Sequence, residues 1–129
     1  FVLGPGEEYM ERKINQILDG NVIIYRNLKL KKLIALISRC SFFISNDSGP
    51  MHIADAVGKP LIVIFGRNQP GLSFRRWGPV NKSATVLWKD VGCKVCFAHN
   101  CNKGFLCLQV ITVDEVFDAF CKKLEEIKV

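Results

Sequence analysis

The feature that most constrains the fold is the alternation of short apolar runs with longer amphipathic segments. The short runs are rich in β-branched and aromatic residues, as buried strands are. They occupy Phe1–Leu3, Val22–Tyr25, Phe42–Ser45, Leu61–Phe65 and Ala84–Trp88. The amphipathic segments carry apolar residues three and four apart, which predicts helices. These segments are Glu7–Leu18, Leu28–Cys40, Gly49–Val57 and Thr112–Ile127.

Strands that alternate with helices favour a parallel sheet covered on both faces. We therefore predict the class α/β, with a doubly wound parallel sheet in one domain of residues 1–129. The 129 residues suffice for one domain with a hydrophobic core, but are few for two. Because the chain begins with Phe1 and not with Met, we interpret it as a piece of a longer protein whose first strand of this domain is missing.

Local signals set the expected ends of these elements. Gly58 should close the third helix, and residues 66–82, rich in Gly, Pro, Asn and Arg, are predicted to be a loop. Thr112 and Glu115 form a capping-box pattern, in which Thr112 caps the last helix and Glu115 reaches back to it.

The charge and hydropathy of the chain limit the classes of partner that we expect. The net charge of +6 favours anionic partners such as nucleotides, phosphorylated lipids or nucleic acid. Solvated, lysine-rich helix faces explain the same charge equally well. The longest central apolar run, Leu61–Phe65, is far shorter than the ~20 residues of a membrane-spanning helix.

Polar residues gather in the loops that follow the predicted strands. These loops are Gly4–Glu8, Arg26–Leu28, Asn46–Gly49 and Gly66–Pro70. Ligands of open α/β sheets bind outside the carboxyl ends of the strands, where such loops lead into helices. The connections at the opposite edge, residues 19–21 and 58–60, are short and plain. This difference between the two edges predicts a ligand cleft, with Gly66, Arg67 and Asn68 at its edge.

The loop after the third strand, in the stretch "SNDSGPMH" (residues 45–52), has the residues of an anion site. Asp47 or Ser48 can cap the following helix, and Gly49 lets a ligand approach the backbone. Pro50 suits the first turn, where no amide hydrogen is needed. Free amides there bind phosphate, and His52 is expected to point to the same place. An acid beside a phosphate must have another role, such as accepting hydrogen bonds from sugar hydroxyls. A plain helix cap with a histidine bonded to backbone is the alternative.

The run "FFISNDSGPMHIADAVGKPLIVIFGRNQP" (residues 42–70) resembles the C-terminal domain of the ADP-heptose:lipopolysaccharide heptosyltransferase family of glycosyltransferases. That family has Asp-Ser/Thr-Gly-x-x-His-x-x-Ala-Ala after a strand, and then a Gly, a Pro and a strand ending in Phe/Tyr-Gly. The matching residues are Asp47, Ser48, Gly49, His52, Gly58, Pro60, Phe65 and Gly66. The segments "VLGPGEE", "NLKLKKLIALISRC" and "CKVCFAHNCNKGFLCLQVITVDEVFDAF" extend the resemblance over essentially the whole chain.

The resemblance implies a Rossmann-like fold, the nucleotide-sugar-binding half of a GT-B enzyme. It implies that Asp47 bonds the donor sugar, and that Ser48, Gly49, Pro50 and His52 form the phosphate-binding segment. It also implies that Glu8, or Glu7, meets the ribose of the nucleotide. Leu28 would lie against the base, although core packing is the more ordinary role of a leucine.

The chain departs from the family pattern at two places. Asp55 precedes Ala56 where the family has two alanines, and Arg26-Asn27 stands where many members have a glycine before the second helix. Arg67, Arg75 and Arg76 lie near the predicted cleft edge, where they would meet an anionic acceptor or be only solvated.

The resemblance implies transfer of a sugar from an ADP-heptose-like donor to the lipopolysaccharide core, with no cofactor required. The acceptor-binding N-terminal domain, with the catalytic base, is absent, so the fragment alone is expected to be inactive. The implied place is the cytoplasm of a Gram-negative bacterium, with peripheral contact at the inner membrane. No nucleic-acid partner is expected from this resemblance.

Residues 91–108 form a cysteine-rich loop with a spacing reminiscent of a zinc knuckle. Its cysteines are Cys93, Cys96, Cys101 and Cys107, with His99 among them. A structural zinc site, reduced structural thiols and disulfides remain open. A zinc-knuckle-like nucleic-acid-binding module is the alternative function, since Trp88, Phe97 and Phe105 lie near the cluster. Cys40 and Cys121, at apolar helical positions, are interpreted as buried, reduced thiols.

Overall fold

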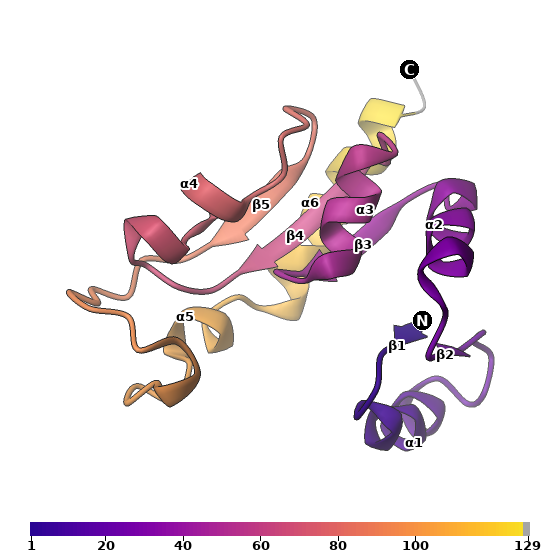
Figure 1. Cartoon of the computed structure of the whole chain (residues 1–129), viewed down its shortest axis with the longest axis horizontal. Coiled ribbons are helices and arrows are strands. Elements are labelled where there is room, and N and C mark those ends of the chain that lie inside the picture. Colours follow the sequence, from indigo (N-terminus) through magenta and orange to yellow (C-terminus); the bar gives the residue numbers. More distant parts are fainter. Residues whose placement is uncertain (128–129) are drawn as a thin grey trace. The chain divides into compact units, whose positions relative to one another are not determined.

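The computed structural model describes residues 1–127, which fall into two compact units (Figure 1). The first unit is Phe1–Leu36 and the second begins at Ile37. The division falls inside the helix α2, Leu30–Arg39, and each unit is described by itself.

The first unit holds a pair of parallel strands and the helix between them. Strand β1, Val2–Leu3, pairs with β2, Tyr25–Arg26, and helix α1, Glu8–Ile17, connects the two strands. The predicted strand Val22–Tyr25 is therefore displaced toward the C-terminus. Its register is fixed by the ends of β1, because the Phe1 carbonyl accepts a hydrogen bond from the Tyr25 amide at 2.9 Å.

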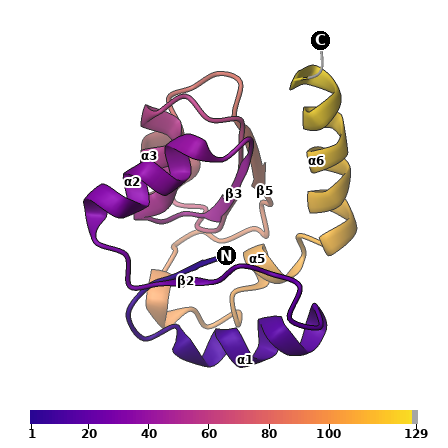
Figure 2. The same ribbon diagram turned by 90° about the vertical axis from the view of Figure 1, so that its right-hand side faces the viewer.

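The second unit is built on the three-stranded parallel sheet β3-β4-β5. These strands are β3, Phe43–Asn46, β4, Leu61–Phe65, and β5, Thr85–Trp88. Helix α3, Gly49–Ala56, covers one face, and helix α6, Val113–Ile127, covers the other (Figure 2). The parallel strands with helices on both faces confirm the predicted α/β, Rossmann-like class.

The core of this unit lies around β4, the central strand. Four of its five residues are buried, as expected of a strand with helices on both faces. Met51 and Ala54 of α3 and Ile37 of α2 complete the buried apolar core of the unit. On the α6 side, the rings of Phe42 and Phe120 meet edge to face, with centroids 5.1 Å apart.

The predicted loop of residues 66–82 is not wholly irregular. It contains the 3₁₀ helix η1, Pro70–Leu72, and the short helix α4, Phe74–Trp77. The Ser73 hydroxyl caps α4 by accepting from the Arg75 amide at 3.4 Å. Phe74 packs against Trp88, with ring centroids 5.2 Å apart, so the segment is ordered by contacts with the sheet that its own composition does not reveal.

The cysteine-rich loop also contains short helices, η2, Ala98–Asn100, and α5, Leu106–Gln109. The capping box that should start α6 is formed only in part. The Thr112 hydroxyl accepts from the Glu115 amide at 3.1 Å, as predicted. The Glu115 carboxylate instead forms an ion pair with Lys89 at 2.7 Å, which ties α6 to the end of β5.

Asp55, the departure noted in the family pattern, joins α3 to the segment that leads into β5. Its carboxylate accepts hydrogen bonds from the amides of Val80 at 2.7 Å and Asn81 at 2.9 Å. The carboxylate therefore has a structural role that the alanine of the family pattern cannot fill.

Candidate functional site

The carboxyl ends of the three parallel strands in the second unit lie at one edge of the sheet. Asp47 follows β3, Gly66 and Arg67 follow β4, and Lys89 follows β5. The Asp47 amide donates to the Ile64 carbonyl at 3.2 Å, so the strand pairing holds the backbone of this acid in place. The strand ends at which the ligand cleft was predicted therefore share one edge of this sheet.

Ser48 immediately precedes α3, but its hydroxyl does not cap the helix. Ser48 has the extended backbone of an N-cap residue, and neither its side chain nor that of Asp47 makes a described cap hydrogen bond to α3. The Ser48 hydroxyl lies 3.2 Å from that of Ser45 and 3.3 Å from the Asn46 carbonyl, to which it donates. The predicted side-chain cap is therefore wrong, because the hydroxyl is engaged on the strand side. Pro50 lies in the first turn, as predicted.

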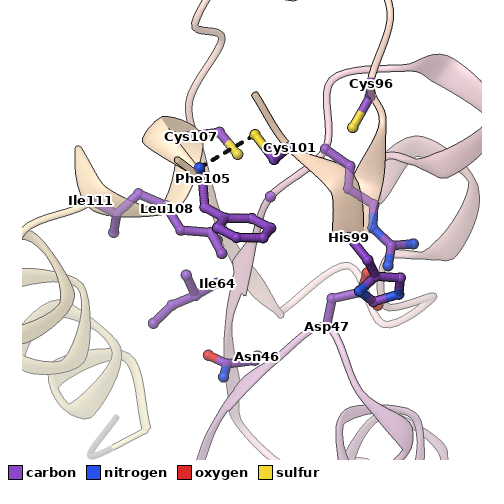
Figure 3. A pocket seen from close by; sticks show the side chains of 12 residues that line it. Asn46, Asp47, Ile64, Cys96, His99, Cys101, Phe105, Cys107, Leu108 and Ile111 are labelled. Atoms are coloured by element: carbon purple, nitrogen blue, oxygen red, sulfur yellow. Dashed lines mark hydrogen bonds between the residues drawn. The ribbon is translucent and has the colours of Figure 1, made fainter. Parts of the chain in front are cut away.

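A pocket of about 410 Å³ opens at this edge (Figure 3). The ends of β3 and β4 and the residues that follow them contribute Asn46, Asp47, Ile64, Gly66 and Arg67. The cysteine-rich loop and the segment after it contribute Cys96, His99, Cys101, Phe105, Cys107, Leu108 and Ile111. The volume falls in the range of small-molecule sites, and a mixture of apolar walls with few polar groups is typical of them.

The predicted site residues of the second unit are only partly brought together by this pocket. Asp47, Gly66 and Arg67 line it, whereas Ser48, Gly49, Pro50 and His52 are not among its described lining residues. His52 is exposed on α3. These four residues therefore stay predictions as phosphate ligands.

Asn68 and Arg75 lie at a separate hollow of about 250 Å³, beside Ser73, Trp88 and Asp90. The Asn68 side-chain amide donates to Asp90 Oδ1 at 2.5 Å. Arg76 lies over the ring of Trp77, 5.2 Å from its centroid, in a cation–π arrangement. The arginines near the predicted cleft edge thus have distinct surroundings, and only Arg67 lines the larger pocket.

The predicted nucleotide-binding residues belong to the first unit. The Glu7 carboxylate accepts from the Gly4 amide at 2.6 Å and so closes the turn before α1. A hydrogen bond from its own backbone amide, then one from the Asn27 side chain at 3.4 Å, holds the pKa of Glu8 below its ordinary value. Leu28 is half-buried. The lowered pKa favours the ionised form of Glu8, and its contact with a ribose stays a prediction.

None of the six cysteines, all of which lie within the described residues, forms a disulfide, and Cys40 and Cys121 are half-buried rather than buried as predicted. Cys96, Cys101 and Cys107 line the pocket, and all four cysteines of the loop border a smaller cavity beside it. Within residues 1–127, no group of three or more His, Cys, Asp or Glu side chains is arranged to hold a metal ion. The thiols as they lie do not fit zinc, so of the three alternatives the structure favours reduced thiols, which a zinc determination would test.

Two pocket residues, His99 and Phe105, were not assigned to the sugar site by the sequence, which considered both only for the zinc-knuckle alternative of the cysteine-rich loop. The polar loops after the strands and the family motif of residues 42–70 singled out this edge, and neither reaches residue 99. One local signal did exist. A Cβ on Gly66 would lie 3.2 Å from Leu108 Cδ2 and 3.4 Å from Cys107 Sγ, so the glycine permits the close approach of the loop.

The fold and the site together define a class: a Rossmann-like α/β domain with a small-molecule pocket at the carboxyl edge of its parallel strands. The model of glycosyltransferase family 9 (heptosyltransferase) matches residues 2–106. The chain therefore belongs to glycosyltransferase family 9.

Sequence similarity to two bacterial heptosyltransferases supports this membership. The chain is 31% identical over 128 residues to lipooligosaccharide heptosyltransferase 2 of Campylobacter jejuni, covering 95% of this chain and 39% of that protein. It is 38% identical over 59 residues to lipopolysaccharide heptosyltransferase 2 of Escherichia coli, covering 46% of this chain and 16% of that one. The chain thus spans well under half of the length of these relatives.

Solved structures agree on the fold. A family 9 glycosyltransferase from Veillonella parvula superposes with a TM-score of 0.77 at 27% identity, covering 98% of this chain and 36% of that one. The E. coli ADP-heptose lipopolysaccharide heptosyltransferase II superposes with a TM-score of 0.73 at 23% identity, covering 99% and 37%. The predicted Rossmann-like α/β fold is confirmed, and the chain matches only part of each of these longer glycosyltransferase chains. Within residues 1–127 no helix is long and apolar enough to cross a membrane.

Proposed function

We propose that this chain is the donor-binding part of a glycosyltransferase that moves a heptose-like sugar from a nucleotide diphosphate to the lipopolysaccharide core. The observation that carries the proposal is Asp47: the acid of the family motif lines a pocket of about 410 Å³ at the ligand edge of the sheet. The names of the relatives, heptosyltransferases of lipopolysaccharide and lipooligosaccharide, support the same substrate classes.

Each residue of the motif has a proposed part in donor binding. The Asp47 carboxylate accepts hydrogen bonds from hydroxyls of the donor sugar. The N-terminus of α3, whose first turn has no side-chain cap from Ser48, binds the diphosphate through the backbone of Ser48 and Gly49 and through its dipole. His52, one turn into the helix, supports that segment. Glu8, or Glu7, and Leu28 meet the ribose and the base.

The proposed reaction is a single displacement at the anomeric carbon of the donor. An acceptor hydroxyl attacks that carbon and gives its proton to a base outside this chain, while the bond to the diphosphate breaks and ADP leaves. Backbone amides at the start of α3 stabilise the charge that grows on the departing diphosphate. The 129 residues alone are expected to bind donor without turning it over.

The remaining partners follow from this function. The base and the acceptor site are assigned to an N-terminal domain of the same enzyme, and the acceptor to the lipopolysaccharide core. The enzyme would work in the cytoplasm of a Gram-negative bacterium, at the inner face of the inner membrane. The matches give no support to a nucleic-acid-binding module, and the thiols as arranged do not form its zinc site.

The test is donor binding to the natural protein in which this chain occurs, measured by calorimetry with ADP-heptose and with ADP. Asp47→Ala should weaken ADP-heptose binding by about tenfold or more, since hydrogen bonds to a charged group contribute about 1.5–3 kcal/mol. ADP, which lacks the sugar, should lose much less affinity. The matched control is Asp118→Ala on α6, an exposed acid outside the pocket.

Two results would contradict the proposal. One is an Asp47→Ala variant that binds ADP-heptose as the parent protein does. The other is a parent protein that binds neither ADP-heptose nor ADP but shows chemical shift changes in residues 93–107 with single-stranded RNA.

A further inference from the structure

Two residues of the pocket have a backbone conformation that their residue types rarely adopt. Four residues other than glycine have positive φ among those described: Asp19, Asn27, Arg67 and Phe105. Asp and Asn tolerate this region, but a bulky aromatic residue there is an outlier. Arg67, at φ 61°, and Phe105, at φ 61°, both line the pocket. Such outliers cluster at ligand sites, where the surroundings hold them in place.

Specific hydrogen bonds hold both of these conformations. The Trp88 indole donates to the Arg67 carbonyl at 3.1 Å. The Phe105 amide donates to Cys101 Sγ at 3.3 Å, and the Phe105 carbonyl accepts from the Leu108 amide at 2.8 Å. The backbone of Phe105 is thus held at both its amide and its carbonyl, which fixes the direction in which the side chain leaves the backbone.

The side chain of Phe105 lies at the pocket. The loop lies against the sheet where Leu108 meets Gly66, at the close approach described above. With the loop docked there, the Phe105 ring, which is 44% exposed, takes part in the wall of the pocket that Asp47 also lines (Figure 3). The strained position therefore presents a large apolar ring to a space that also holds a carboxylate.

We propose that Phe105 is a specificity-determining residue that contacts the apolar C–H face of the donor sugar while Asp47 binds its hydroxyls. A sugar ring has polar edges and an apolar face, and the pocket offers a carboxylate and an aromatic ring to match them. This inference rests on the proposed function of the chain. It gives the cysteine-rich loop a direct part in choosing the sugar.

The chain offers a substitution that removes the ring without straining the fold. Glycine adopts positive φ freely, so Phe105→Gly keeps the loop conformation while it deletes the ring. In the natural protein, Phe105→Gly should weaken ADP-heptose binding by about tenfold, the effect of burying one aromatic side chain. ADP binding should stay within about twofold. Phe105→Tyr, which keeps the ring, should bind ADP-heptose nearly as the parent does.

The matched control is Phe97→Gly. Phe97 belongs to the same loop and is 57% exposed, but it borders the smaller cavity and is not among the described residues of the pocket. Phe97→Gly should therefore leave binding of ADP-heptose unchanged. Thermal unfolding of both variants reports whether the loop change has altered the fold.

The pocket thiols give a second, independent measurement. ADP-heptose should slow the alkylation of Cys96, Cys101 and Cys107 by iodoacetamide, whereas Cys121 on α6 should react at an unchanged rate. ADP alone should protect the three pocket thiols less, because it lacks the sugar.

The outcomes separate this inference from the function on which it rests. If Asp47→Ala loses ADP-heptose binding but Phe105→Gly does not, the role of Phe105 is wrong and the proposed function stands. Equal losses of ADP and ADP-heptose binding in Phe105→Gly would place the ring against the nucleotide and overturn the inference. A parent protein that binds neither ligand would overturn both proposals.

Discussion

Removing the carboxylate of Asp55 should uncouple α3 from the segment that enters β5. The carboxylate accepts two hydrogen bonds from backbone amides, at 2.7 Å from Val80 and at 2.9 Å from Asn81. Asn81 in turn accepts from the Ala84 amide at 3.0 Å, one residue before β5 begins. Asp55→Ala therefore removes the acceptor on which this connection depends.

The two hydrogen bonds are unequal in strength. Bonds to a charged group contribute about 1.5–3 kcal/mol each, and less where water can replace the acceptor. Val80 is 89% exposed, so its amide regains most of its hydrogen bonding from water, whereas Asn81 is half-buried. We expect Asp55→Ala to lower the free energy of unfolding by about 2–3 kcal/mol, and the melting temperature by about 10 °C. Asp55→Asn keeps one acceptor oxygen and should lose about half as much.

Urea unfolding followed by circular dichroism measures this loss, with Asp118→Ala as the control. Asp118 is exposed on α6, so its substitution should change the free energy of unfolding by no more than about 0.5 kcal/mol. If Asp55→Ala also stays within that range, the hydrogen bonds do not hold the segment and the reasoning fails. An unchanged m-value with a lower midpoint would show that the loss is one of stability.

Three further predictions concern the loop, the first unit and the thiols. Gly66→Ala should weaken ADP-heptose binding severalfold because its Cβ would push on Leu108 at 3.2 Å, whereas Gly71→Ala, with nothing within 4 Å, should not. The hydrogen bond from Arg26 holds the pKa of Glu11 below its ordinary value, so this pair stabilises the first unit where the carboxyl is ionised, and the gain is lost as pH falls through the lowered pKa. Glu11→Gln should therefore reduce acid sensitivity in urea titrations at graded pH, and unchanged sensitivity would argue against the pair. Alkylation of denatured protein prepared without reductant or chelator should count six free thiols, and mass spectrometry of the native protein should find no zinc; one bound zinc ion per chain would contradict the arrangement of the cysteines.

The elements that were predicted well are those whose burial and ends can be inferred from a continuous stretch of the sequence. Strand β4 was predicted with the bounds it has, because Leu61–Phe65 is apolar on both faces and ends at a glycine. Helix α3 ends near Gly58, whose φ of +68° stops the helix as expected. Strand β2 was displaced because its bounds depend on which residues β1 offers for pairing, and the local sequence does not contain that information.

The residues of the candidate site likewise include some that the sequence predicts and some that it does not. Asp47 could be placed at the pocket because the motif and the strand end are contiguous in sequence. Phe105 could not, because its place depends on the cysteine-rich loop folding back onto Gly66, a contact between segments far apart in the chain. The positive φ of Phe105 also could not be predicted from the sequence, because phenylalanine rarely adopts it.

The left-handed backbone of Phe105 makes this position a place where two kinds of selection would disagree. A library of variants at residue 105 that is sorted only for thermal stability should be enriched in glycine and asparagine, the residues that suit that backbone. The same library sorted for growth that depends on a complete lipopolysaccharide core should favour aromatic residues. The difference between the two rankings would measure the folding stability that the proposed contact of residue 105 with the donor sugar costs.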